Sequence, residues 1–255
     1  MLRWFRADLH IHTCLSPCGD LTMSPLRVVK MACEKEIDII GICDHNSAEN
    51  VKAAINAAEL IGKERTHSLP LAILPGMEVC TKEEVHIIGL FRRLEDVLKM
   101  QELVYQTLPA EKNNPELFGE QIIANEFDEV EGYNERLLIG ASNLSVKEVV
   151  DHIHNFNGIA IASHIDREAY SLIGQLGFIP EDLSLDAIEI SHNITIEDAY
   201  GKFPEIKKYS VIRSSDAHFL EDIGKATTKF FIAEPTIEEI KMALRNEKER
   251  KTQLL

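Results

Sequence analysis

Short apolar runs alternate along the whole chain with longer segments in which apolar residues recur every three or four positions. The short runs are rich in isoleucine and valine and are bounded by turn residues, which is typical of β-strands. Several are apolar at every position, as expected of strands covered on both faces in a parallel sheet. We predict strands at residues 7–12, 37–43, 71–79, 85–91, 158–163, 187–191 and 209–213, with an edge strand at 229–232.

The longer segments carry helix start signals. Ser24 and Pro25 combine an N-cap residue with a proline at the first helical position, and they predict a helix that ends near Lys35. Ser145 and Glu148 have the spacing of a capping box. Alternating strands and helices imply parallel strands with helical crossovers, and about seven strands in a chain of this length predict an α/β fold of the (βα) barrel type.

Residues 95–143 interrupt this alternation. The segment is polar and acidic, and Asn113, Asn114 and Pro115 form a break in any helix. We predict a mostly helical insertion that covers one end of the barrel. Because no stretch rich in proline, glycine or serine marks a linker, we expect residues 1–255 to form a single domain.

Composition and charge narrow the functional classes. A hydrophobic fraction of 45% and a charged fraction of 27% are ordinary for a folded protein with a sizeable core. The formal net charge of −15 argues against an extended nucleic-acid surface held by phosphate attraction. No apolar run has the length of a membrane span, the N-terminus lacks a secretory signal, and the five cysteines have no paired spacing. We therefore expect a cytoplasmic protein with no membrane partner.

The first predicted strand carries the most informative polar pattern. Asp8, His10 and His12 alternate there with apolar residues. Because side chains in a strand point to opposite faces in turn, we expect these three on one face and Leu9 and Ile11 on the other. Two imidazoles on one face make half of a metal site, and Asp8 is expected to orient them.

Other residues able to bind metal follow the ends of later strands. In a parallel barrel the carboxyl ends of the strands share one rim, where active sites are built. His86 begins a strand instead, and it reaches the same rim if that strand is antiparallel to its predecessor. The candidates outnumber the ligands of one catalytic zinc, so we expect two or three ions, bridged by Glu78 or Asp216. The candidates are His10, His12, His45, Glu78, His86, His164, Asp216 and His218.

Six motifs in this order resemble those of the polymerase and histidinol phosphatase (PHP) family of metal-dependent phosphoesterases. They are Asp8-Leu-His10-Ile-His12, Cys43-Asp-His45-Asn46, Gly76-Met-Glu78, His86-Ile-Ile-Gly89, His164 and Ser215-Asp-Ala-His218. The resemblance implies a distorted (βα)7, TIM-like barrel with two or three divalent ions at one rim, and zinc, manganese and iron all suit these donors. It implies a first ion on His10, His12, Glu78 and Asp216, and a second on Glu78, His86 and His164.

The resemblance also implies a third ion on His45 and His218, with a further ligand from the loop after the first strand. Family members often carry that ligand five or six residues after the second histidine of the first motif, where this chain has Pro17 and Cys18. We favour Asp20, because oxygen ligands suit phosphoester chemistry. Cys18 is the alternative, since a thiolate is a good zinc ligand.

Substrate contacts are expected from residues near the same rim. Arg167, three residues after His164, matches a family arginine that binds substrate phosphate, and a guanidinium fits phosphate oxygens with two parallel hydrogen bonds. The alternative is a surface arginine paired with a neighbouring acid. His192 and Asn193 follow a later strand and are expected to contact substrate. Asp44 is expected to orient a ligand imidazole.

The resulting functional hypothesis is a phosphomonoesterase that hydrolyses a small phosphorylated metabolite or nucleotide through a metal-activated hydroxide. Glu78 and Asp216 would act through the metal ions, and His218 or His45 would protonate the leaving alcohol. The alternatives are an amidohydrolase-type C–N hydrolase and a non-catalytic metal-binding regulatory module. The expected partner is a small phosphorylated substrate, with no extended nucleic-acid surface.

Overall fold

One mixed sheet organises the residues that the computed structural model describes, 1–64 and 70–255. Within these residues its nine strands are β1 (Arg3–Ile11), β2 (Ile39–Ile42), β3 (Ala72–Cys80), β4 (His86–Leu90), β7 (Ile159–Ala162), β8 (Ala187–Ile190), β9 (Val211–Arg213), β10 (Thr228–Ile232) and β11 (Lys251–Leu254). The strands β2, β7 and β8 are buried at every position, as expected of strands covered on both faces.

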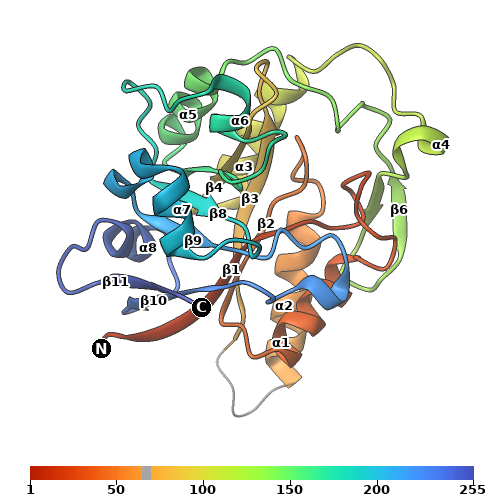
Figure 1. Cartoon of the computed structure of the whole chain (residues 1–255). Helices are drawn as coiled ribbons and strands as arrows, with labels where there is room; N and C mark the ends of the chain where they lie inside the picture. Colours follow the sequence, from red (N-terminus) through yellow and green to blue (C-terminus); the bar gives the residue numbers. More distant parts are fainter. Residues whose placement is uncertain (65–69) are drawn as a thin grey trace.

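The sheet curves until its edges nearly meet, in the order β11-β10-β1-β2-β3-β4-β7-β8-β9 (Figure 1). Strands β1 to β3 run parallel, as do β7 to β9, whereas β4 is antiparallel to both β3 and β7. The edge strands β9 and β11 contact each other. The Thr228 hydroxyl accepts from Arg213 N at 2.8 Å and donates to Arg213 O at 2.9 Å. The predicted barrel is confirmed. The strand predicted at 229–232 is β10, which pairs antiparallel with β1 and lies between β1 and β11 instead of at the edge, and the antiparallel edge strand β11 was not predicted.

Helices cover the outside of the barrel. Those described are α1 (Pro25–Glu34), α2 (Val51–Glu64), α3 (Leu94–Tyr105), α4 (Pro115–Phe118), α5 (Val146–Asn155), α6 (Leu172–Leu176), α7 (Ile196–Lys202) and α8 (Ile237–Leu244), with 3-10 turns η1 (Pro204–Lys208) and η2 (Leu220–Asp222). Helices α2 and α3 pack on β3, and α5 packs on β4 and β7. The capping box predicted at Ser145 and Glu148 is present. No helix among the described residues has both the length and the apolar composition that crossing a membrane requires.

The amino-terminal ends of the strands are closed by α8. Lys241 of this helix donates from Nζ to the carbonyl of Gly158, just before β7, at 3.2 Å. The Leu244 carbonyl accepts a hydrogen bond from Ser210, just before β9. Apolar residues of α8 belong to the same buried cluster as Phe5. The carboxyl-terminal ends of the strands are therefore left to form a functional rim.

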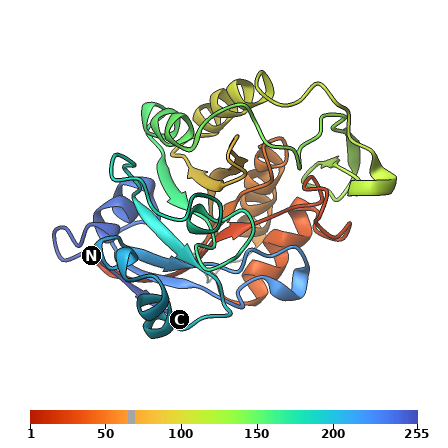
Figure 2. The same ribbon diagram turned by 45° about the horizontal axis from the view of Figure 1, so that its top comes forward.

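Residues 95–143 are helical only in α3 and α4. The chain then forms a two-stranded hairpin of β5 (Ile122–Ala124) and β6 (Val130–Tyr133). Gly119 ends α4 with a φ of 99°, a conformation that favours glycine and stops the helix. The Asn50 side chain fastens β5 to the start of α2, because it donates to one β5 backbone group and accepts from another, both at 3.0 Å. The segment thus lies beside the loops after β1 and β2 (Figure 2). That residues 95–143 are an insertion within a single domain of residues 1–255 stays a prediction.

Candidate metal centre

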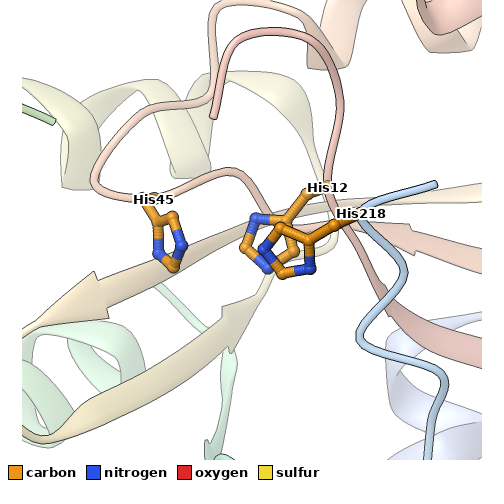
Figure 3. Close-up of side chains that lie close together, drawn as sticks. All are labelled: His12, His45 and His218. Atoms are coloured by element: carbon orange, nitrogen blue, oxygen red, sulfur yellow. The ribbon is translucent and has the colours of Figure 1, made fainter. Parts of the chain in front are cut away.

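The eight candidate ligands from the predicted strands and their ends lie together at the carboxyl-terminal end of the barrel, whereas Asp20 does not join them. The antiparallel pairing of β4 with β3 brings His86 to this end, as predicted. His10, Glu78 and His164 are at most 2% exposed. His67 lies outside the described residues. Three groups have donor atoms within 4.8 Å of one another, and Figure 3 shows the first: His12, His45 and His218; His10, His12 and Glu78; His45, Glu78 and His86.

Glu78 occupies the centre of this cluster. Burial alone would raise the pKa of its carboxyl, but His86 and His10 hold that pKa well below its ordinary value. Glu78 is therefore ionised, with five imidazoles around it. Its carboxylate oxygens lie 3.0 Å from His45 Nδ1, 3.3 Å from His10 Nε2, 3.3 Å from His86 Nδ1, 3.5 Å from His164 Nε2 and 3.6 Å from His12 Nε2.

Hydrogen bonds fix which ring nitrogens of His10 and His12 face the centre of the cluster. Nδ1 of His10 donates to Glu189 Oε1 at 3.1 Å, because a carboxylate only accepts. Nδ1 of His12 donates to Ser16 Oγ at 2.9 Å, since that hydroxyl itself donates to Asp44 at 2.7 Å. In the neutral rings the two Nε2 atoms carry the lone pairs, and they lie 3.1 Å apart. Two lone pairs that face each other at this distance favour a cation beside them.

Asp216 links the two histidines of β1 to Arg167. Its Oδ1 lies 3.3 Å from His10 Nε2 and 3.2 Å from His12 Nε2. Its Oδ2 lies 2.6 Å from a guanidinium nitrogen of Arg167. Burial opposes ionisation, but His10 and His12 lower the pKa of Asp216 well below its usual range. A second anionic oxygen donor therefore faces the same imidazoles as Glu78.

Three residues at this rim have a left-handed backbone. The φ angles are 52° at Asn46, 27° at His164 and 51° at Asp216, and each residue follows the carboxyl end of a strand. Such conformations cost about 1–3 kcal/mol each and gather at functional sites, so surrounding contacts must hold them. At Asn46 the side-chain amide donates to the carbonyls of Leu138 and Gly140, both at 2.8 Å.

Buried polar atoms without a partner show where cations fit. In the described structure both carboxylate oxygens of Glu78, Nδ1 of His86 and Nδ1 of His164 are buried and form no hydrogen bond. Leaving such an atom unsatisfied costs about 1–3 kcal/mol. Imidazole nitrogens and carboxylate oxygens are donors that divalent metal ions accept. The residues of this cluster therefore fit the expected metal ions.

The loop after β1 brings Cys18, not Asp20, to the cluster. Asp20 Oδ1 accepts from Thr22 N at 2.8 Å and from Thr22 Oγ1 at 2.6 Å, so a local turn takes up this carboxylate. Cys18 lines the cavity at the rim and contacts the imidazoles of His45 and His218. Burial alone would raise the pKa of the Cys18 thiol, but the two imidazoles outweigh this effect and lower the pKa to about 6. The preference for Asp20 as a ligand is corrected.

A cavity of about 430 Å³ opens beside the cluster. Arg167 lines it and pairs with Asp216, so this arginine is not a surface residue paired only with a sequence neighbour. Its side chain is 40% exposed, which places the guanidinium at the mouth. Ile139 and Tyr170 form an apolar wall, and the Tyr170 ring stacks on His86 with centroids 4.6 Å apart. Sequence reasoning did not find this wall.

His192 and Asn193 do not reach this cavity. They line a separate cavity of about 320 Å³ together with Arg213. Directly after β8, Ser191 donates to Asp166 from its backbone N at 2.7 Å and from its hydroxyl at 2.6 Å. Ser191 is held by Asp166, and the next residue, His192, lines the separate cavity and not the one beside the metal cluster. The prediction that His192 and Asn193 contact substrate at this rim is therefore corrected.

Sequence reasoning missed Glu189 and misplaced Asp8. Glu189 is 1% exposed, and an acid inside the otherwise apolar strand β8 was the available signal. The pairing of β1 with β2 shifts register between Asp8 and Ile11, so Asp8 does not share a face with the two histidines. Its carboxylate instead accepts from the backbone N of Ser215 at 2.9 Å and of Gly224 at 2.8 Å. It anchors the loops around the centre.

Two family models match the parts of the chain that carry these ligands. Residues 8–176 match the model described as PHP domain. The chain belongs to the PHP family. Residues 205–248 match a second model, described as PHP-associated, so Asp216 and His218 of this PHP protein fall in that part. The resemblance inferred from the motifs is confirmed.

The PHP protein is similar to named nucleases, to one in sequence and to another in fold. It is 31% identical over 86 residues to a 5′-3′ exoribonuclease of Haemophilus influenzae, which is 32% of this chain and 27% of that protein. An uncharacterised protein of Methanocaldococcus jannaschii is 26% identical over 193 residues, 72% of this chain and 80% of the relative. The lesion-specific endonuclease EndoQ of Pyrococcus furiosus has a similar fold, with a TM-score of 0.71 and 19% identity over 98% of this chain and 58% of that chain. The PHP protein thus spans only part of the exoribonuclease and of the endonuclease.

A further solved structure contradicts our expectation about the partners of this protein. We expected a small phosphorylated substrate and no extended nucleic-acid surface. An Endonuclease Q complex with the same fold, TM-score 0.70 over 98% of this chain, holds a 27-mer duplex with an abasic lesion at its active site. Our reasoning was wrong because a net charge of −15 is an average over the chain. Binding of phosphate depends on the local field, which bound cations reverse.

Proposed function

We propose that this PHP protein is a metal-dependent hydrolase that cleaves phosphoester bonds of a nucleic acid. One observation carries the proposal: an ionised Glu78 among five imidazoles faces the cavity whose mouth holds Arg167. This combination suits a phosphoester, because cations held by these ligands and the guanidinium of Arg167 would stabilise its anionic oxygens.

From membership of the PHP family we assign three positions for divalent ions to side chains of this cluster. When bound, zinc, manganese or iron would stabilise charge on phosphoryl oxygens as a Lewis acid and lower the pKa of a water molecule. Glu78, shared by the first two positions, would hold them together. The first position has His10, His12, Glu78 and Asp216, the second has Glu78, His86 and His164, and the third has His45 and His218.

Arg167 is the residue of this chain that binds the phosphate in our proposal. Its guanidinium contacts Asp216 through one nitrogen, and this contact holds the side chain over the metal ligands. A guanidinium has five N–H donors, so donors are left for two phosphate oxygens. Arg167 would thereby orient the phosphate toward the side chains of the first position.

The cavity suits one nucleotide of a strand. Its volume of about 430 Å³ lies within the usual range for small-ligand sites, and Tyr170, 41% exposed, offers a ring face on which a base can stack. Because Glu78 is buried below the opening, a nucleotide within a duplex must leave the base stack to reach it. The relatives named as exoribonuclease and endonuclease support this class of substrate.

We assign His218 and His45 to metal binding rather than to protonation of the leaving oxygen. Nδ1 of His218 donates to the carbonyl of Asp216 at 2.9 Å, because a carbonyl only accepts. Nε2 is then the nitrogen with a lone pair, which is what a metal ion requires. His45 directs Nδ1 at Glu78 at 3.0 Å and sits within the same group of donors.

The test is a substrate panel with the full chain loaded with zinc or manganese. It contains end-labelled single-stranded RNA and DNA, a duplex, the same duplex with an abasic site, a small phosphate monoester and a set of amides. We expect cleavage of at least one nucleic acid that stops when a chelator is added and in Glu78→Gln. His152→Gln is the matched control, because His152 lies on α5 and stacks on Phe156 away from the cluster.

Each other outcome identifies a different function. Turnover of amides alone would support the amidohydrolase alternative and overturn the proposal. Bound metal without turnover of any substrate would support a regulatory module. Metal-dependent turnover of the small monoester alone would show that the chemistry is right and the nucleic-acid substrate is wrong.

A further inference from the structure

Cys18 lies where the third metal position lacks a ligand. The loop between β1 and α1 places it in the lining of the cavity, and its thiol contacts the imidazoles of His45 and His218. These two residues form a close group with His12, whose Nδ1 is already bound to Ser16. His45 already directs Nδ1 at Glu78, 3.0 Å away, and the imidazoles of His45 and His218 alone leave a zinc position short of the four ligands it usually takes.

The loop that carries Cys18 is held in place from both sides. Gly19 N donates to Ser16 O and Asp20 N donates to the carbonyl of His218, both at 2.8 Å. The second bond fixes the chain two residues after Cys18 directly against a histidine of the same cluster. From the other side, Gly119 packs closely on this loop. The space beside its Cα is so small that a Cβ atom there would lie only 2.1 Å from Pro17 O. The thiol is thus positioned before any ion binds.

No other side chain of this loop competes for the position. The Asp20 carboxylate accepts two hydrogen bonds from Thr22 and does not line the cavity. Among the other cysteines, Cys14, Cys43 and Cys80 are buried and are not part of the lining. An independent observation points to a ligand in the same cavity. His86 and Glu78 line it, and Nδ1 of His86 and both carboxylate oxygens of Glu78 are buried without a hydrogen bond.

We infer that Cys18, through its sulfur, completes the third metal position with His45 and His218, and that this position selects zinc. The inference rests on the proposed metal centre and specifies which metal ion its third position binds. One sulfur and two nitrogens suit Zn²⁺ or Co²⁺, whereas Mg²⁺ and Mn²⁺ prefer oxygen. The other two positions have oxygen donors from Glu78 and Asp216. The centre therefore has one soft position that keeps zinc beside two that accept harder ions.

The experiment uses cobalt as a spectroscopic probe of the sulfur. Metal-free full-length protein is titrated with Co²⁺, and we expect a thiolate-to-cobalt charge-transfer band in the near ultraviolet. In Cys18→Ser the band is lost, and zinc retained after dialysis falls by about one ion per chain. Cys33→Ser, on α1 and outside the cavity, is the matched control and keeps both. Cys18→Asp replaces the soft sulfur donor with a hard oxygen donor. We expect this variant to bind a third ion without the charge-transfer band and to prefer Mn²⁺.

A band that persists in Cys18→Ser, or its absence from the cobalt-loaded wild type, would overturn the inference. Equal zinc content in wild type and Cys18→Ser would do the same. Neither readout uses a substrate. A protein that shows the band but cleaves no nucleic acid therefore refutes the proposed function alone, and one that cleaves without the band refutes only the role of Cys18.

Discussion

Glu189 Oε1 lies 3.1 Å from Nδ1 of His10, and both side chains are at most 1% exposed. The same oxygen accepts from the backbone N of His164 at 3.2 Å. One acid from the middle of the barrel therefore orients two predicted metal ligands that lie far apart in the sequence. A carboxylate behind a ligand imidazole fixes its tautomer and increases its basicity.

Replacing Glu189 by glutamine is expected to weaken metal binding. Glutamine keeps the size of the side chain but loses the charge that favours an Nδ1–H on His10. We expect zinc affinity to fall by about 10- to 100-fold, as is typical for such partners, measured by competition with a chelator. Asp186→Asn is the control, because Asp186 pairs with His154 at 2.8 Å outside the cavity. An unchanged affinity in Glu189→Gln would rule out this positioning role.

Glu78→Gln is expected to lower hydrolysis by at least about 100-fold, because the amide has no charge among the five imidazoles. Elemental analysis should find fewer metal ions per chain. Asp216→Asn should act in the same direction, since its carboxylate faces His10 and His12. Circular dichroism checks that the fold is kept. If either folded variant hydrolysed substrate at the wild-type rate, the metal centre would not be the catalytic site.

Arg167→Ala is expected to weaken substrate binding without loss of metal. A charged hydrogen bond contributes about 1.5–3 kcal/mol, so we expect KM to rise by about 10- to 100-fold. Arg167→Lys should recover only part of this, because an ammonium lacks the planar fork. Metal content is measured beside the kinetics, since Arg167 also contacts Asp216. A lower metal content with an unchanged KM would assign Arg167 to the metal centre instead of the phosphate.

Asp8 makes stability depend on pH in a direction that can be tested. Burial raises its pKa from 3.8 to about 6, despite the hydrogen bonds from Ser215 and Gly224. The folded state then holds the proton more tightly than the unfolded state, so stability falls as pH rises from about 4 to about 6. Relative to Asp8→Asn, the metal-free wild type should lose about 3 kcal/mol across this window. Urea unfolding across this pH range measures it, and parallel curves for the two proteins would contradict the raised pKa.

Much of the fold and of the donor list could be predicted because both depend on local patterns. Apolar runs predict strands wherever they occur, and the capping box at Ser145 forms from four consecutive residues. Histidines placed at strand ends meet at one rim in any parallel barrel, and this brings His45 and His164 together with Glu78. The role of Glu189 could not be predicted, because it depends on what lies across the barrel from β8.

The sequence by itself determined the barrel, the family and the eight candidate ligands, since strand periodicity, motif order and ligand chemistry are properties of short segments. Only the tertiary structure decided which neighbours join them. A register shift takes Asp8 away from the histidines, and a turn with Thr22 takes up Asp20. Cys18 instead contacts His45 and His218. The places of Asp8 and Cys18 depend on contacts between distant segments, which local sequence does not specify, whereas the turn that takes up Asp20 is local.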